Sequence, residues 1–290
     1  MSAVNLKEFK TFFLSGKGGV GKSTLSAALA AALSRKGFKT LLVSLDPAHS
    51  LSPLFERKIG AEPTEVLPGL FCLEVDLERE MREYLKRVER EAEKLVSPAV
   101  IQQVKDQIEL AYLSPGALEL AALDAIYKIV SRESEQFDRL VFDTAPSGYT
   151  VRLTASTGKL VNWVNSLITL REEALKYRAM AGKREEEDPV VEALKRRREE
   201  YSFLGKLFKS PSTLFAVVVN PGKLPLEIGR RTVKELESAG VPVKAVFANR
   251  FKEEVKELFG KPAACFPPLD REPIGTKALE PLIEQFESLL

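Results

Sequence analysis

The sequence Gly16-Lys17-Gly18-Gly19-Val20-Gly21-Lys22-Ser23-Thr24 decides the fold of this chain. It matches the pattern GxxxxGK[ST], follows the apolar run Thr11–Leu14 and opens an alanine-rich segment that ends before Gly37. A strand, a glycine-rich loop and a helix in this order form a phosphate-binding P-loop. Glycines let backbone N–H groups approach phosphate oxygens, and the N-terminus of the helix adds positive potential.

The whole loop, from Gly16 to Thr24, is therefore expected to bind a nucleotide. Lys22 is expected to reach the β- and γ-phosphates, and the Ser23 hydroxyl to bind Mg²⁺. A glycine-rich turn without function is the alternative, and the strand and helix on either side disfavour it. The loop predicts a nucleotide hydrolase.

Short β-rich runs alternate with helix-like stretches along the chain. The runs are Thr11–Ser15, Lys39–Leu45, Leu70–Val75, Arg139–Phe142, Leu214–Val219, Val243–Ala248 and Ala263–Phe266. This alternation predicts an α/β fold with a doubly wound, mostly parallel sheet. Because the chain has one P-loop and no internal repeat, we expect a single domain over residues 1–290, and a second nucleotide site would have to come from another chain.

Two connections, 76–138 and 153–212, are much longer than a strand-to-strand crossover requires, and we interpret both as helical insertions that form a helical subdomain. Apolar residues recur in them at helical spacing, among them Leu120, Leu123, Tyr127, Leu160, Val164 and Ile168. The charged stretch Lys183–Asp188 is expected to be a solvated loop. Periodicity leaves open whether the apolar faces pack against the sheet or line a groove.

The composition excludes several classes of protein. Lys and Arg number 43 against 41 Asp and Glu, so the net charge of +2 gives no reason to expect a specific nucleic-acid partner. Cys72 and Cys265 belong to no CxxC pair, which argues against a disulfide framework or a zinc site. The sequence shows no signal-peptide core and no apolar run long enough to span a bilayer, so we expect a cytoplasmic protein.

Two further segments place carboxylates after apolar strands. Arg139–Asp143 would deliver Asp143 to the Mg²⁺ site, through a water molecule. Asp46 stands at the start of Asp46-Pro47-Ala48-His49-Ser50-Leu51-Ser52. Its carboxylate could position or deprotonate an attacking water, or it could cap the turn before the proline, and the residues alone favour neither.

These segments together resemble one family. A second lysine early in the loop, Lys17, is typical of the deviant Walker A class. Within that class, the segment from Asp46 and the segment Asp143-Thr144-Ala145-Pro146-Ser147-Gly148-Tyr149-Thr150 resemble DPAHNLSD and DTAPTGHT, the switches of the ArsA and tail-anchored-protein targeting (GET-type) ATPases. Ser50 and Tyr149 stand where the family has Asn and His, so no role is transferred to them.

The resemblance implies a homodimeric ATPase that uses ATP and Mg²⁺. Its catalytic residues would be Asp46, which handles the water, Lys22, and Lys17, which would cross the dimer interface to the partner's nucleotide. Asn249 follows an apolar strand at the position where the family contacts adenine, and Pro267 and Pro268 resemble the loop that covers the base. A GTPase would have Asp at Lys252, which can only donate, so ATP is expected rather than GTP.

Several roles are known in this class, and an iron–sulfur carrier is disfavoured because the sequence has no paired cysteine motif. An arsenite-pump or anion-pump ATPase subunit binds arsenic through clustered thiolates, which two distant cysteines do not supply. A MinD-like protein needs a basic C-terminal helix, whereas Lys277–Leu290 is acidic, and a ParA-like partitioning ATPase needs a basic surface. We therefore expect a nucleotide-gated targeting factor that binds hydrophobic membrane-anchor helices, visits the membrane transiently and meets a membrane receptor there. The pump subunit and the ParA/MinD-like ATPase remain the alternatives.

Overall fold

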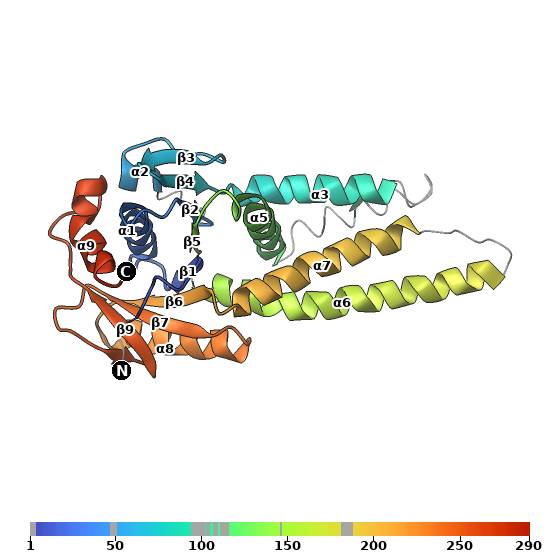
Figure 1. The fold of residues 1–290 in the computed structure, drawn as a ribbon. Helices are drawn as coiled ribbons and strands as arrows, with labels where there is room; N and C mark the ends of the chain where they lie inside the picture. The colour runs from blue at the N-terminus through green and yellow to red at the C-terminus, as the bar shows by residue number, and fades with distance from the viewer. Residues whose placement is uncertain are drawn as a thin grey trace.

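A nine-stranded sheet with helices on both faces forms the body of the molecule (Figure 1). The computed structural model describes residues 4–46, 51–93, 102, 105–106, 110, 116–145, 147–180 and 188–290. The strands are β1 (Thr11–Gly16), β2 (Thr40–Ser44), β3 (Thr64–Leu67), β4 (Leu70–Glu74), β5 (Arg139–Asp143), β6 (Thr213–Val219), β7 (Val243–Asn249), β8 (Glu257–Leu258) and β9 (Lys261–Phe266).

The strand order is β3-β4-β2-β5-β1-β6-β7-β9-β8. The two outermost pairs, β3 with β4 and β8 with β9, are antiparallel, and the other neighbours are parallel. The predicted mostly parallel sheet is confirmed, and each predicted strand is present within two residues of its expected bounds. The short strands β3 and β8 were not predicted. Because the parallel strands share one direction, their carboxyl ends meet at one edge of the sheet.

Helices form two layers. They are α1 (Lys22–Arg35), α2 (Leu51–Phe55), α3 (Leu77–Glu93), α5 (Ala117–Glu133), α6 (Ser147–Met180), α7 (Pro189–Lys209), α8 (Lys223–Ser238) and α9 (Glu280–Glu287), with a 3-10 helix η1 (Thr276–Leu279). Helices α1 and α9 share one hydrophobic cluster with one face of the sheet. Helices α5, α6, α7 and α8 share a second cluster with the other face.

The alternation of side chains along each strand explains the two layers. On β1, Phe12 points to the α1 side and Phe13 to the α6–α7 side. Phe13 stacks between Phe142 of β5 and Phe215 of β6, with 4.7 Å between ring centroids in both pairs, and Phe208 of α7 packs against its edge. Strands buried on both faces are nearly continuous apolar runs, which is why the sequence predicted them well.

Helices α6 and α7 form a long antiparallel hairpin that extends beyond the sheet on the same side as α3 (Figure 1). At 34 residues, α6 is about 51 Å long. Asp188 accepts hydrogen bonds from the backbone N–H groups of Val190 and Val191, and so caps α7. It also pairs with Arg171 of α6 at 2.8 Å, which joins the two helices near the far end of the hairpin. Within the described residues, every helix is too short or too polar to cross a bilayer.

The structure changes three expectations about the helical insertions. Helix α6 begins at Ser147, six residues before the expected start of the second insertion. Leu123 and Val164 are fully buried, and Ile168 is 7% exposed, in the cluster that covers the sheet, so these residues form core and not a groove. Asp188 is a helix cap rather than part of a loop, whereas residues 183–187 lie outside the described residues.

Candidate nucleotide site

The predicted site residues lie at or just beyond the carboxyl ends of parallel strands. The P-loop follows β1, Asp46 follows β2, Asp143 ends β5, Asn249 ends β7, and Pro267 and Pro268 follow β9. Strand β1 lies between β5 and β6, so its loop opens at the centre of this edge. In open α/β sheets, ligands bind in the crevice at this edge. Segments far apart in the sequence are thus brought together around one phosphate-binding loop.

The geometry of the loop requires glycine at particular positions. A Cβ on Gly16 would lie 2.6 Å from the carbonyl oxygen of Val218 on β6, so only glycine fits there. Gly19 and Gly21 have φ values of 79° and 92°, in the left-handed region that favours glycine. Gly21 precedes α1 and supplies no side-chain cap. The first N–H groups of α1 are therefore available to phosphate oxygens.

Asn249 supports the loop. Its side-chain amide nitrogen donates a hydrogen bond to the carbonyl oxygen of Val20 at 2.8 Å, and the residue is 5% exposed. A Cβ on Gly21 would overlap the same amide nitrogen. The expected contact of Asn249 with adenine stays a prediction, and any such contact would have to use the remaining amide N–H or the amide oxygen. The structure adds a role that the sequence did not suggest, which is to fix the loop against β7.

The two lysines of the loop differ in exposure. Lys22 is 5% exposed and lies close enough to Asp143 to lower the pKa of that carboxyl group. Lys17 is exposed, as are Gly18 and Gly19. The first lysine is therefore accessible to a molecule outside this chain, whereas the second belongs to the interior of the site.

Asp143 is a fully buried carboxylate, and neither of its oxygens has a hydrogen-bond partner among the described residues. Burial raises its pKa to about 7, and the neighbouring Asp46 carboxylate raises it as well, whereas Ser23 and Lys22 lower it. A buried carboxylate without a partner beside a hydroxyl group fits Mg²⁺, which prefers oxygen ligands. The described residues contain no cluster of three or more His, Cys, Asp or Glu, so the ion would take its other ligands from water and phosphate.

Asp46 lies beside Asp143 because β2 and β5 are neighbours. The backbone N–H of Leu45 donates to the carbonyl oxygen of Asp143 at 2.9 Å, and the N–H of Asp46 donates to Ser44 Oγ at 3.3 Å. Asp46 is half-buried at the rim of the site. The next four residues, 47–50, lie outside the described residues, so the sequence match there has no structural counterpart.

Glu74 is a functional candidate that the sequence reasoning missed. It is 5% exposed at the end of β4 and accepts hydrogen bonds from the backbone N–H groups of Leu51 and Ser52 at 2.8 and 3.3 Å. These are the first residues of α2, so the carboxylate caps this helix and fixes it to the sheet. A glutamate at the end of an otherwise apolar strand was the available signal. Glu74 thus positions Leu51 and Ser52, at the start of α2.

The segment after Asp143 is anchored to the central strand. Thr144 Oγ1 donates to the carbonyl oxygen of Leu14 on β1 at 2.7 Å and pairs with Thr150 Oγ1 at 2.8 Å. Both threonines are fully buried. Pro146, in the same segment, lies outside the described residues. The hydroxyl groups therefore hold the start of α6 at the carboxyl end of β1, beside the P-loop.

The first turns of α6 are also tied to α5. The Tyr149 hydroxyl donates to the carbonyl oxygen of Leu118 at 2.9 Å, and Arg152 pairs with Glu119 at 2.7 Å. Burial raises the pKa of Tyr149, so the hydroxyl keeps its proton and remains a donor. The tyrosine that departs from the expected histidine thus links the segment after Asp143 to the helical layer.

Comparison with known proteins identifies the relatives of this chain. The family model described as anion-transporting ATPase matches residues 9–288. An Aquifex aeolicus protein provisionally named arsenical pump-driving ATPase 2 is 36% identical over 84% of this chain and 81% of its own length. ATPase GET3B of Arabidopsis thaliana is 31% identical over 83% of this chain and 64% of its own length. The arsenical pump-driving ATPase of Escherichia coli is 30% identical over 79% of this chain and 37% of its own length.

Proposed function

The chain belongs to the anion-transporting ATPase, or ArsA, family and is a nucleotide-using ATPase, and from this premise we propose that it acts as a homodimeric, nucleotide-gated targeting factor for apolar membrane-anchor helices. The family that the motifs predicted is confirmed. Its members carry names from arsenical pumps and from GET3-type ATPases, and this chain spans only a third to two thirds of several of them. Support for the targeting role comes from the helical layer of this chain.

An exposed apolar stripe on α6 carries the proposal. Trp163, Leu170 and Tyr177 are 58%, 62% and 74% exposed, although they are large apolar side chains. They follow one another at intervals of seven residues, and Leu167 and Ala174 lie between them. Steps of four and three residues place all five on one side of a helix. We call them the α6 stripe. Its exposure indicates a surface that another apolar element covers.

The α6 stripe is distinct from the face that α6 buries. Val164 and Ile168 lie on the buried face, about one third of a turn away from Trp163 and Leu170 around the helix. From Trp163 to Tyr177 the stripe is about 21 Å long, which is a large part of the roughly 30 Å apolar length of a membrane-spanning helix. One stripe covers one side of such a helix. Two stripes, one from each protomer, would cover two sides, which supports a composite groove in a dimer.

The proposed chemistry assigns a role to each charged residue at the site. Lys22 would bind the transferred phosphoryl group, and Asp46 would orient the attacking water from the rim. Ser23 and Asp143 would hold Mg²⁺, which supplies positive charge to the phosphate oxygens when it is bound. Exposed Lys17 would reach the nucleotide of the partner protomer. This arrangement would make hydrolysis depend on dimer formation.

Helix α6 supplies the proposed link between ATP hydrolysis and the bound membrane-anchor helix, which we call the client. It begins at Ser147, four residues after Asp143, and carries the α6 stripe. A change in the segment after Asp143 would therefore move the stripe directly. Tyr149 and Arg152 bind α5, so the helical layer would follow α6.

The arsenical-pump names of several relatives favour a second role, in which the ATPase responds to arsenite. The positions of the two cysteines do not support it. Cys72 is buried on β4, and Cys265 lies on β9, six strand positions away and about 29 Å across the sheet. One protomer thus cannot bring two thiolates to one arsenic atom.

Capture of a client helix tests the proposal. A photoreactive residue in place of Leu170 should crosslink, in the presence of ATP, to a client with a C-terminal anchor of about 20 apolar residues. Leu170→Asp with Tyr177→Asp should abolish capture and leave basal hydrolysis unchanged. The matched control, Asn165→Asp with Thr169→Asp, adds the same charge on the far side of α6. Absence of crosslinking, or stimulation of hydrolysis by arsenite or DNA and not by the client, would show that the targeting role is wrong.

A further inference from the structure

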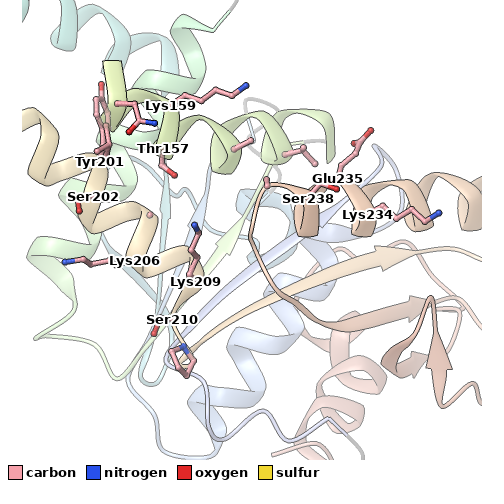
Figure 2. Close-up of a pocket in the computed structure, with 18 of the residues that line it drawn as sticks. Thr157, Lys159, Tyr201, Ser202, Lys206, Lys209, Ser210, Lys234, Glu235 and Ser238 are labelled. Atoms are coloured by element: carbon pink, nitrogen blue, oxygen red, sulfur yellow. The ribbon is translucent and has the colours of Figure 1, made fainter. Parts of the chain in front are cut away.

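A second surface, away from the nucleotide site, is a broad, open groove between three helices (Figure 2). Its walls are the first half of α6, the last turns of α7 and the second half of α8, and its volume is about 1240 Å³. It contains no residue of the P-loop or of the α6 stripe. The groove lies on the face of the sheet that α6 and α7 cover, opposite α1. It is therefore separate from both surfaces that the proposed function uses.

The groove is strongly basic, although the whole chain is nearly neutral. Its cations come from three helices: Lys159 of α6, Lys206 and Lys209 of α7, and Arg231 and Lys234 of α8. In Figure 2, Lys209 extends into the space between the helices, and Lys206 and Lys234 extend outward at its rim. Among the described residues, Glu235 is the only carboxylate in the lining, and it is paired with Arg231 at 2.7 Å.

The four lysines of the groove have no ion-pair partner among the described residues. Lys206 and Lys209 lie in the last turn of α7, where the helix dipole stabilises a cation. Lys159 of α6 and Lys234 of α8 do not lie in the last turn of their helices, so the dipole does not explain them. Arg231 and Glu235 neutralise each other, so the four exposed lysines leave the groove and its rim with a net positive charge, which favours an anionic ligand.

Small residues form part of the groove lining and leave room for a bulky ligand. Gly158 has no atom within 4 Å of the position that a Cβ would occupy, and Gly205 has only Thr157 at 3.6 Å. Ala155 and Ser202 lie on the same walls, next to the apolar ring of Tyr201. A helix with a radius of about 5 Å fills roughly 120 Å³ per residue, so the groove holds about ten residues, or almost three turns.

We propose that this groove docks an acidic amphipathic helix of a partner protein, with its apolar side toward the small residues and its carboxylates toward the lysines. A single phosphate group would use only a small part of the volume. Nucleic acid is disfavoured because Tyr201, the aromatic residue of the lining, is 5% exposed and offers no face for base stacking.

Binding of a labelled peptide to the full-length chain tests the proposal. The probe is an amphipathic peptide of about 12 residues, with Glu on one side of the helix and Leu on the other. Fluorescence anisotropy should show saturable binding at low ionic strength that weakens as salt is added, because salt screens exposed charges. A peptide with Lys in place of Glu should not bind. Failure of the acidic peptide to bind at low salt would overturn the proposal.

Two variants separate charge from shape. The triple variant Lys159→Glu, Lys206→Glu and Lys234→Glu should raise the Kd of the acidic peptide by more than about tenfold. Gly158→Phe, which fills the groove without changing its charge, should weaken binding by a similar factor and leave basal ATP hydrolysis unchanged.

The matched control makes the same charge change at exposed lysines elsewhere, with Lys36→Glu, Lys86→Glu and Lys256→Glu. It should leave the Kd within about twofold. Equal binding by the groove and control triples, or full binding by Gly158→Phe, would show that the peptide sits elsewhere. Anionic vesicles and oligothymidylate are the competing probes. If either loses affinity for the groove triple while the peptide does not, the helix-docking proposal is wrong.

Discussion

Asp143 should make the nucleotide-free protein less stable as the pH rises, and Asp143→Asn should remove this effect. Burial raises the pKa of this carboxyl group from 3.8 to about 7. Between these values the folded chain holds a proton that the unfolded chain has lost, so the free energy of unfolding falls with increasing pH. At about 1.4 kcal/mol per pKa unit, the loss is about 4 kcal/mol in total, of which about 3 kcal/mol falls between pH 5 and pH 8.

The assay is urea unfolding of the wild type and of Asp143→Asn in the presence of a chelator, from pH 5 to pH 8. The difference between their free energies of unfolding should shift in favour of the variant by about 3 kcal/mol across this range. The control, Asp270→Asn, removes an exposed carboxylate and should show no such shift relative to the wild type. Mg²⁺ with ATP should stabilise the wild type more than Asp143→Asn. A difference that is constant with pH would refute the assignment of a protonated, buried Asp143.

Three further predictions follow from the geometry. Gly16→Ala should lower the free energy of unfolding by about 2 kcal/mol in urea titrations, because its Cβ would overlap the carbonyl oxygen of Val218. Mixing Lys17→Ala and Asp46→Asn chains should restore part of the ATPase activity that each lacks alone, and no recovery would reject action across a dimer interface. Asp188→Ala should cost about 1 to 2 kcal/mol in the same titrations and speed hydrogen exchange in the first turn of α7, because the helix loses its cap.

The local signals in the sequence predicted the P-loop and the central strands. Phe12 to Leu14 is an apolar run that can only be buried on both faces, and the glycines that follow are required by backbone geometry. The edge strands β3 and β8 lack this signal, because they are short and partly exposed. Features set by a few neighbouring residues, such as the P-loop and the central strands, were therefore predictable. The pairing of the short edge strands was not.

Residues that act through distant partners could not be predicted in the same way. Glu74 caps a helix that lies 22 or more residues earlier in the sequence, and Asn249 braces a loop 229 residues away. The pKa of Asp143 depends on complete burial, which no sequence pattern gives. Periodicity also failed on α6, since that helix has two apolar faces. Val164 belongs to the buried face and Trp163 to the exposed one, and both fit a helical repeat.

One long helix offers a physical reason why a small change at the nucleotide could control a distant surface. In the proposed mechanism α6 is held at both ends, by Tyr149 against α5 in its first turns and by Arg171 against the cap of α7 near its far end. Because Arg171 joins α6 to the cap of α7, the two helices of the hairpin would tilt together. Tyr177 lies about 42 Å from the first turn, so a tilt of about 5° there moves the end of the α6 stripe by about 4 Å. A displacement of that size is comparable to the diameter of a side chain, and it is enough to separate two stripes that together enclose a client helix.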